Sequence, residues 1–233
     1  MAPYMIFFED TSPPGPPLPV TSGLLMYMDA GNSSSYPGTG TTWTCLEGSG
    51  TATLLGPSAP VYSSADGGYI DFNNERYAHV SSQFFNMPGL TIFSFIRVPV
   101  LPSNYDALIF SRSAANSPTG FHFGFNARLA IHYNGSIISS TLTPTLNEWI
   151  MVAATVSTSS VVFYRGSSSG ITQQTRTGTY TSCFMENIGI CIDRQITYRN
   201  SNVDMSIAMI YDRPLSTAEI TQNFDLFKSR YGY

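Results

Sequence analysis

SIAMIYDRPLSTAEITQNFDLFKSRYGY, residues Ser206–Tyr233, decides the fold class of this chain. Its opening run, Ile207–Tyr211, alternates in the manner of a strand and is ended by a breaker, DRP. Ser216 and Glu219 then form an S-x-x-E capping box, which is the signature of a helix start. The apolar residues that follow recur at helical spacing, so one face of this short helix is expected to pack on the rest of the protein: Ile220, Phe224 and Phe227.

The rest of the chain reads as strands, and no other stretch reads convincingly as helix. About twelve short apolar runs are separated by turn signals, of which Asn134-Gly135 is the strongest. This pattern predicts an all-β protein, a two-sheet antiparallel jelly-roll sandwich with one short C-terminal helix. The run Leu90–Val98 alternates as a half-buried strand does. The expected strands are Leu24–Met28, one headed by Trp43, Tyr69–Phe72, Tyr77–Val80, Leu90–Val98, Leu108–Phe110, Phe121–Phe125, Arg128–Tyr133, Trp149–Val156, Val161–Arg165, Ile188–Ile192 and Ile207–Tyr211.

Residues 1–20 differ from everything after them and predict an extended N-terminal arm ahead of a domain at 21–233. A proline-rich run favours polyproline II, which would make a semi-rigid spacer of roughly 20–30 Å. An apolar tip precedes this stalk, and the combination predicts an anchor that docks into a partner. The alternative is that the tip folds back on its own domain or adds a strand to its sheet. The predicted docking residues are Met5, Ile6, Phe7 and Phe8 in the tip, and Pro13, Pro14, Pro16 and Pro17 in the stalk.

The chain carries few charges. Of its 233 residues, 11% are Asp, Glu, Lys or Arg, against about 25% in an average soluble domain. The net charge of −4 and the lack of a basic run argue against binding to nucleic acid or to an anionic membrane. Neither a secretory signal nor a membrane-spanning stretch is recognisable. A protein without an export signal can still leave the cell if it is made in a host cytoplasm and released as part of a virus particle.

Three cysteines, Cys45, Cys183 and Cys191, occur without a C-x-x-C motif. An odd number of cysteines with no disulfide framework favours reduced thiols and assembly in a reducing cytosol. The alternative that Cys183 and Cys191 pair across a tight hairpin stays open, because sequence does not place their Cβ atoms.

Four blocks of the sequence carry a resemblance to a known family: GLLMYMDAGNSSSYPGTGTTW (23–43), NEWIMVAATVS (147–157), NIGIC (187–191) and IAMIYDRPLSTAEITQNF with the final RYGY (207–233). Together they resemble the laminin-G-like, concanavalin A-like lectin/glucanase superfamily, and more narrowly its single-domain versions in bacteriophages and other viruses. The resemblance spans about residues 23–233. It implies a concanavalin A-type jelly roll and a role in carbohydrate or protein contact at a surface, often on virions.

Two loops depart from the family pattern. Cys45 stands where members commonly carry Asp, and Asn73-Asn74 stands where members often have the D-G of F-D-G. Both changes remove carboxylates from loops, which weakens the case for a calcium site of the family type. Jelly rolls often pin loops with calcium, so a structural calcium ion remains the only cofactor considered, with Asp29 and Asn32 as its weak candidates.

Catalysis is not expected. Glucanases on this fold need carboxylates at alternate positions of one strand, and no E-x-D-x-E or D-x-E pattern occurs. Glu9 and Asp10 lie in the arm, while Asp71 and Glu75 are separated by a turn. No G-x-S-x-G nucleophile elbow is present either. A glycoside hydrolase is therefore the least favoured function.

The histidines His79, His122 and His132 are not expected to form a metal site. If Asn126-Ala127 closes a two-residue hairpin, His122 lies opposite Ile131, and the imidazoles of His122 and His132 fall on opposite faces of the sheet. Solvated or hydrogen-bonded histidines are then expected.

Glycan binding would need an aromatic platform beside amide and carboxylate groups. Trp43 and Trp149 lie within strand patterns and are expected in the core. Loop aromatics and their polar neighbours are the better candidates for contact with a glycan: Tyr36, Tyr105 with Asp106, and Tyr198 with Asn200.

These features predict a non-enzymatic virion structural protein. The jelly roll would be displayed on the virion surface, and the arm would dock it onto the capsid or another virion protein in a decoration, cement or fibre role. The alternative is a glycan-binding adhesion module that recognises host-surface carbohydrate. No nucleic-acid partner or membrane insertion is expected. A homo-oligomer is typical of virion appendages, although no residue indicates the oligomeric state.

Overall fold

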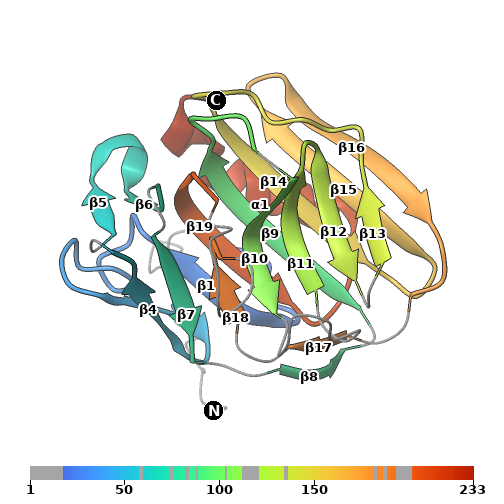
Figure 1. Ribbon diagram of the computed structural model, residues 1–233, viewed down its shortest axis with the longest axis horizontal. Coiled ribbons are helices and arrows are strands. Elements are labelled where there is room, and N and C mark those ends of the chain that lie inside the picture. Colours follow the sequence, from blue (N-terminus) through green and yellow to red (C-terminus); the bar gives the residue numbers. More distant parts are fainter. Residues whose placement is uncertain are drawn as a thin grey trace, which may run out of the picture.

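The computed structural model describes residues 18–57, 60–73, 76–81, 84–87, 89–102, 104–111, 121–133, 136–180, 183–185, 188–192 and 201–233. Over these ranges the chain forms two antiparallel sheets packed face to face, with one short α-helix (Figure 1). The predicted all-β sandwich with a C-terminal helix is therefore confirmed. The predicted docking residues in the tip Met5–Phe8 and in the proline stalk 13–17 lie outside the described residues.

The first sheet contains nine of the described strands. Seven follow the order β16-β15-β14-β9-β19-β1-β3, and β6 pairs with β19 and with β5. Its strands are β1 (Leu24–Asp29), β3 (Glu47–Gly48), β5 (Val61–Ser63), β6 (Tyr69–Asp71), β9 (Leu90–Arg97), β14 (Trp149–Val156), β15 (Ser160–Ser167), β16 (Gly170–Thr177) and β19 (Asp204–Tyr211).

The second sheet lies in front of the first in Figure 1 and contains eight described strands in the order β13-β12-β11-β10-β18-β7-β4-β2. Its strands are β2 (Thr42–Thr44), β4 (Thr51–Leu55), β7 (Tyr77–Val80), β10 (Asn104–Ser111), β11 (Phe121–Asn126), β12 (Leu129–Tyr133), β13 (Ser136–Ser139) and β18 (Ile188–Ile190). A separate two-stranded sheet joins β8 (Phe84–Met87) to β17 (Cys183–Met185). The remaining elements are helical: η1 (Ala65–Gly67), α1 (Thr217–Phe227) and η2 (Lys228–Tyr231).

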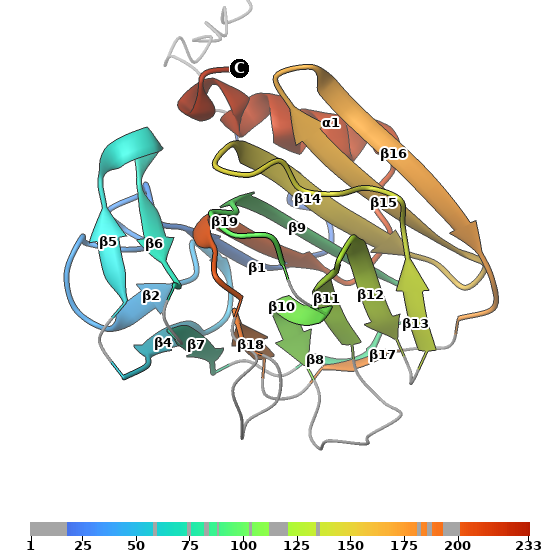
Figure 2. The ribbon, with the colours of Figure 1, turned by 45° about the horizontal axis from the view of Figure 1, so that its top comes forward.

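Two hydrophobic cores hold these layers together. The larger core fills the space between the sheets and includes Trp43, which is fully buried as the sequence predicts. The smaller core lies between the outer face of the first sheet and α1, where the ring of Phe95 stacks on that of Phe224 with 6.0 Å between centroids. Figure 2 shows α1 lying across the first sheet on the side away from the second. The protein is therefore layered as helix, sheet and sheet.

The central strands of the first sheet are buried on both faces because of this layering. In β14, Ile150 and Val152 belong to the larger core and Met151 belongs to the smaller one. The same holds for β9, so the prediction that Leu90–Val98 is only half-buried is wrong. Its outward-facing Phe93 is fully buried because α1 covers that face of the sheet.

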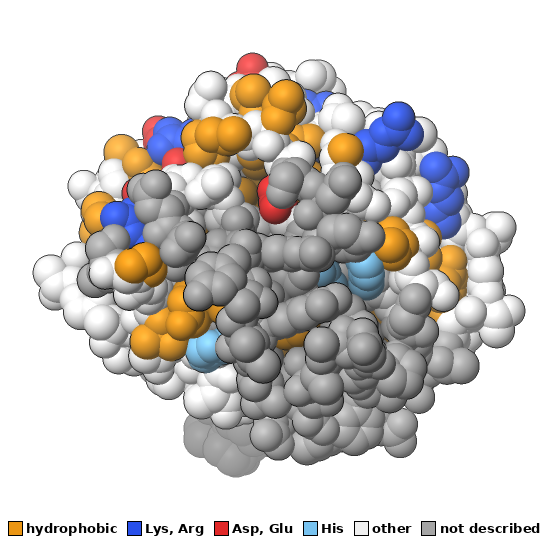
Figure 3. All heavy atoms as spheres, in the orientation of Figure 1, with side chains coloured by type: hydrophobic (Ala, Val, Ile, Leu, Met, Phe, Trp, Pro, Cys, Tyr) orange, Lys and Arg blue, Asp and Glu red, His pale blue; other side chains and the backbone are white. Residues whose placement is uncertain are grey.

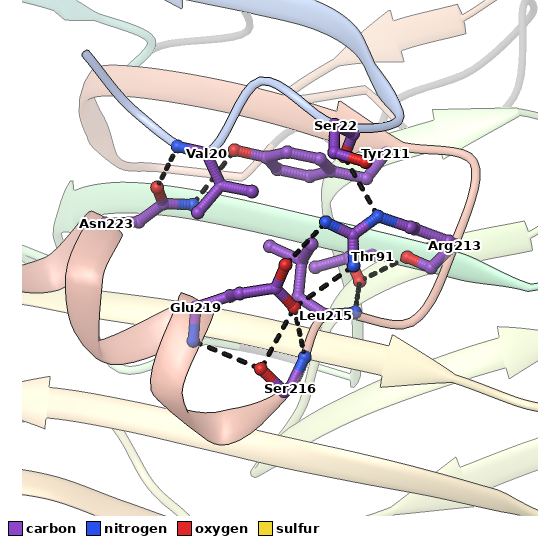
Figure 4. Close-up of polar contacts among 9 residues, drawn as sticks. All are labelled: Val20, Ser22, Thr91, Tyr211, Arg213, Leu215, Ser216, Glu219 and Asn223. Carbon is purple, nitrogen blue, oxygen red and sulfur yellow. Dashed lines mark hydrogen bonds and ion pairs between the residues drawn. The ribbon is translucent and has the colours of Figure 1, made fainter.

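The helix begins where the capping box predicts. Ser216 is the N-cap residue, and its Oγ accepts a hydrogen bond from the Glu219 N–H at 3.3 Å (Figure 4). The Glu219 carboxylate accepts from the Ser216 N–H at 2.8 Å and from both terminal nitrogens of Arg213 at 2.6 and 3.0 Å. These bonds from Arg213 stabilise the charged carboxylate and lower the pKa of Glu219 to about 2.

The first described residues are tied to this helix. The Val20 N–H donates to Asn223 Oδ1 at 2.8 Å, and Asn223 Nδ2 donates to the Tyr211 hydroxyl at 2.9 Å (Figure 4). Arg213 Nε donates to the Ser22 carbonyl at 3.0 Å. Pro19 and Val20, which the sequence assigns to the arm, are buried on the domain. The path of the chain is therefore fixed from this point onward.

We expect Glu219→Gln to lower the free energy of unfolding by about 1 kcal/mol at pH 7, because glutamine keeps the capping box but loses the ion pair with Arg213. The folded-state pKa of Glu219 is lowered from 4.5 to about 2. The advantage of the wild type is therefore complete above pH 4.5 and is lost as the pH falls toward 2. Urea denaturation between pH 7 and pH 2 measures the difference. Glu148→Gln, at an exposed acid, is the control; an equal loss in both variants would contradict this assignment.

Candidate functional site

A groove of about 480 Å³ lies where the start of the domain, β1 and the end of α1 meet. Its apolar wall consists of Leu18, Pro19, Leu46, Leu226 and Phe227. Its polar and charged groups come from Tyr27, Asp29, Asn32, Glu47 and Arg230. Segments from both ends of the described chain therefore build one concave surface that mixes apolar and hydrogen-bonding groups.

The apolar wall follows from the way α1 packs. Phe227 turns into the smaller core, where its ring lies 6.1 Å from that of Tyr27. The adjacent Leu226 is half-buried and faces the groove. On the opposite side, the Leu46 N–H donates to the Tyr27 carbonyl at 2.8 Å, which fixes Leu46 beside β1. At the rim, the Leu18 side chain is 61% exposed.

A buried ion pair between Asp29 and Arg230 forms the charged part of the groove. Arg230 Nη1 donates to Asp29 Oδ1 at 2.6 Å and Nη2 donates to Oδ2 at 2.9 Å. The Asp29 side chain is 2% exposed and that of Arg230 is 26% exposed. Asp29 also accepts from the Gly31 N–H at 2.8 Å and from the Tyr27 hydroxyl at 3.2 Å. Each carboxylate oxygen thus accepts two hydrogen bonds, so its lone pairs are filled.

Tyr27 contributes a donor that stays protonated. Its burial and the neighbouring Asp29 carboxylate both raise the pKa of Tyr27. The hydroxyl therefore keeps its proton at all physiological pH values and continues to donate to Asp29.

Two glycines make room for the Arg230 side chain. Gly67 of η1 has a φ of +75°, and a Cβ atom there would lie 2.0 Å from Arg230 Cγ. A Cβ atom on Gly31 would lie 1.8 Å from the Gly67 carbonyl oxygen and 2.9 Å from Arg230 Nη1. No larger residue fits at either position, so the guanidinium reaches Asp29 through a slot that glycine alone permits.

Two exposed polar side chains stand at the edge of the groove. Asn32 Oδ1 accepts from the Ser34 N–H at 2.9 Å, which orients the Asn32 amide and leaves its Nδ2 donors for other partners. Glu47 is paired directly with Tyr27 in the β1–β3 ladder, so the two side chains stand on the same face of the sheet. The groove thus offers an amide donor and a carboxylate acceptor to a ligand.

The predicted calcium candidates Asp29 and Asn32 do meet at this groove, but the arrangement does not suit a cation. The Arg230 guanidinium already occupies the position beside Asp29 that a calcium ion would need. The Asn32 Oδ1 is engaged by Ser34. In the described parts of the chain, no three His, Cys, Asp or Glu side chains gather as a metal-ligand group. The structure therefore gives the calcium candidates no support.

A second polar cluster surrounds Arg97 at the end of β9. Arg97 Nε donates to Asp204 at 2.8 Å, and Nη1 donates to Asp66 at 3.0 Å. The guanidinium lies over the rings of Tyr69 and Trp149, 4.9 and 5.3 Å from their centroids. These contacts tie β9 to β19, η1 and β6. Trp149 is 7% exposed in this cluster, which confirms the prediction that it is buried.

The structure removes one predicted glycan-binding residue, and Tyr105 and Asp106 are not among the residues that line the groove. Tyr36 is 3% exposed, its hydroxyl donates to the Gly40 carbonyl at 2.8 Å, and its ring packs on Tyr62. The prediction that Tyr36 is a loop platform is therefore wrong, because its ring is part of the larger core. Tyr105 and Asp106 lie on β10 in the second sheet, where Asp106 is half-buried and the Tyr105 side chain is not among the described atoms. Tyr198 and Asn200 lie outside the described residues.

The prediction that His122 and His132 lie on opposite faces is wrong. The two residues are directly paired in the β11–β12 ladder, and their rings stack with centroids 5.1 Å apart. The connection holds three residues rather than two, with Ala127 at a φ of +58°, and one extra residue moves the side chains of one strand to the other face. Histidine side chains are visible in pale blue on the face of the second sheet in Figure 3.

The cysteines agree with the expectation of reduced thiols where the structure describes them. Cys45 and Cys191 are free, so the alternative pairing of Cys183 with Cys191 is not formed. Burial raises the pKa of the Cys45 thiol to about 11, which keeps it protonated and unreactive. None of the helices among the described residues is long and apolar enough to cross a lipid bilayer.

Sequence reasoning missed Tyr27, Glu47 and Arg230 as groove residues. One signal was available, because Asp29 ends an apolar strand and a buried carboxylate needs a partner. That signal indicates that a cationic partner exists, but it does not identify Arg230, which is 201 residues away in sequence.

No protein-family model matches the chain, and no curated protein does. Several solved structures, in contrast, match the chain in fold. A mutant of Trypanosoma rangeli sialidase displaying trans-sialidase activity is 13% identical with a TM-score of 0.59, and the match covers 91% of this chain and 34% of that one. Domain 4 of AbnA, an extracellular arabinanase from Geobacillus stearothermophilus, in complex with arabinotriose, is 12% identical with a TM-score of 0.58. That match covers 88% of this chain and 98% of the arabinanase domain. The binding domain of botulinum neurotoxin DC in complex with SialylT is 14% identical with a TM-score of 0.61. That match covers 90% of this chain and 52% of the neurotoxin chain.

These likenesses show the fold. This chain spans about a third of the length of the sialidases and about half of the length of the neurotoxin domains it matches. At such identities they establish a β-sandwich, and fold alone does not give a ligand. The resemblance to viral, laminin-G-like domains stays a prediction.

We expect Arg230→Met to lower the free energy of unfolding by about 3–5 kcal/mol, because it leaves the Asp29 carboxylate buried without its cationic partner. Adding Asn at position 29, in the double variant Asp29→Asn/Arg230→Met, removes the stranded charge and should recover a large part of that loss. Urea denaturation of the two variants measures both values. Arg128→Met, at an exposed arginine, is the matched control and should change stability by less than about 0.5 kcal/mol. A double variant no more stable than the single one would contradict the ion-pair account.

Proposed function

We propose that this domain is a carbohydrate-binding module without catalytic function, and that the groove between β1 and α1 holds the sugar. The observation that carries this proposal is the composition of the groove. An apolar wall with accessible side chains from Leu18, Leu46 and Leu226 faces the exposed amide of Asn32 and the exposed carboxylate of Glu47 across about 480 Å³.

The size and the chemistry of the groove fit one or two sugar units. Pockets for small ligands typically measure about 300–1,000 Å³ and combine an apolar lining with a few fixed polar groups. A sugar ring has apolar C–H faces that pack against leucine and aromatic side chains, while each hydroxyl both donates and accepts. The Asn32 Nδ2 group supplies donors and the Glu47 carboxylate supplies an acceptor, so both needs of a hydroxyl are met.

Two of the similar structures support this proposal. Domain 4 of the arabinanase matches along nearly its whole length and is in complex with arabinotriose. The neurotoxin binding domain is described in complex with SialylT. A domain that matches this chain along nearly its whole length is therefore in complex with a carbohydrate in the arabinanase, whereas the match covers only 52% of the neurotoxin chain. The residues of a site must be argued separately for each chain.

The arrangement of acids favours binding over catalysis. Glycosidases of the usual kind use two carboxylates that flank the scissile bond. The acids that line the groove are Asp29 and Glu47. The oxygens of Asp29 are filled by Arg230, Tyr27 and Gly31, so this carboxylate is not available as an acid, base or nucleophile. Glu47 alone does not make a hydrolytic pair.

Asn32→Asp tests the proposed site. Aspartate keeps the acceptor for the Ser34 N–H but loses the Nδ2 donors. The loop conformation should therefore be kept, and the affinity for the glycan is expected to fall about fivefold. An array of neutral and acidic glycans identifies the ligand, and titration calorimetry with that ligand measures the affinity. Gln222→Glu makes the same chemical change at an exposed position of α1 outside the groove and serves as the control. An array without any saturable ligand would overturn the proposed function.

A second role, attachment of the module to a virion component through residues 1–17, has one supporting observation. Pro19–Ser22 are held on the domain by Asn223 and Arg213, so a preceding arm would leave from a fixed point. Deleting residues 1–17 is expected to abolish incorporation into virus particles while the melting temperature of the domain stays unchanged. Normal incorporation of the shortened protein would remove the attachment role.

A further inference from the structure

We propose that the groove selects neutral glycans and rejects acidic ones, and that Glu47 is the residue that imposes this selectivity. The inference rests on the proposed function and names the ligand class of the same groove. Three charged side chains line the groove: Asp29, Glu47 and Arg230. The ion pairs among these side chains decide whether a ligand meets a positive or a negative charge.

Arg230 is the cation of the groove, and it is already committed. Both of its terminal nitrogens donate to Asp29, at 2.6 and 2.9 Å, in the two-pronged geometry that carboxylates favour. A sugar carboxylate that took these two N–H groups from Asp29, whose side chain is 2% exposed, would leave a buried charge without a partner. Stranding a buried carboxylate is strongly unfavourable, so these two N–H groups stay with Asp29, and the positive charge of Arg230 is balanced by its partner before a ligand arrives.

The Arg230 side chain is also held in place along its length. Its stem passes over Gly67, where a Cβ atom would lie only 2.0 Å from Cγ, and its guanidinium lies 5.4 Å from the centroid of the Phe227 ring. The guanidinium is thus fixed from several sides. A rotation outward toward a ligand would break the ion pair and the ring contact together.

Glu47 is then the charge that a ligand meets. It is exposed at the rim, and within the described parts of the chain no ion pair involves it. A carboxylate on a sugar at about 4 Å from Glu47 would be repelled strongly enough to weaken binding about fivefold, even with the dielectric constant of water. The net charge of −4 adds long-range repulsion of the same sign. A neutral sugar instead gains an acceptor for its hydroxyls.

The experiment compares glycans that share one core and differ by a single acidic unit. The full-length protein is titrated in 50 mM NaCl with two pairs of ligands. One pair is lactose and 3′-sialyllactose, and the other is the best neutral array ligand and its uronic-acid or sialylated counterpart. The neutral member of each pair is expected to bind at least about fivefold more tightly. In 500 mM NaCl the ratio should narrow, because screening weakens the repulsion from Glu47.

Glu47→Gln identifies the residue responsible. Removing its charge should lower the neutral-to-acidic affinity ratio about fivefold, whereas Glu148→Gln, the same change at an exposed acid outside the groove, should leave the ratio unchanged. Acidic members that bind as tightly as neutral ones, or an unchanged ratio in Glu47→Gln, would overturn this inference while the carbohydrate-binding function stands. Failure of every glycan to bind would instead overturn the proposed function itself.

Discussion

The buried ion pair between Asp29 and Arg230 is the constraint on which the rest of this molecule depends. It joins β1, at the start of the domain, to η2, which follows α1, and the two residues are 201 positions apart. Because the Arg230 stem passes Gly67, the same contact also fixes η1. The helix is therefore fastened at both ends, by the Ser216 cap and by this pair, and the smaller core between α1 and the first sheet is closed.

Local patterns were enough to predict most of the fold. The capping box at Ser216 located α1, and alternation located strands such as β14, because both signals depend on neighbours within a few residues. Two features escaped. The three-residue turn around Ala127 carries no glycine or asparagine at its left-handed position, so nothing in the sequence marks the slip that pairs His122 with His132. The double burial of β9 depends on where α1 lands, which alternation within the strand does not reveal.

The site was far less predictable than the fold, because it is built from contacts between distant segments. Sequence singled out Asp29 and Asn32, and both line the groove. The structure gives the interpretation as calcium ligands no support, because the partner of Asp29 is Arg230, and no local pattern connects the two residues. Tyr36 shows the opposite error. Its loop position suggested an exposed ring, whereas the ring packs in the larger core and the hydroxyl donates to a backbone carbonyl. Residue type and loop position describe what a side chain can do, but burial decides whether it is available.

The ion pair also shapes the groove for the proposed ligand. Asp29 accepts from the Gly31 N–H at 2.8 Å, and the Asp29 N–H donates to Ser35 Oγ at 3.1 Å, so the loop that carries Asn32 is held at both ends by the residue that holds Arg230. Glu47 stands on a strand paired with β1. The backbone of the polar rim is thus fixed before a ligand arrives, which reduces the conformational entropy that binding would cost. Stability and the proposed recognition therefore share one buried contact, so the chemistry of the groove cannot be separated from the closure of the fold.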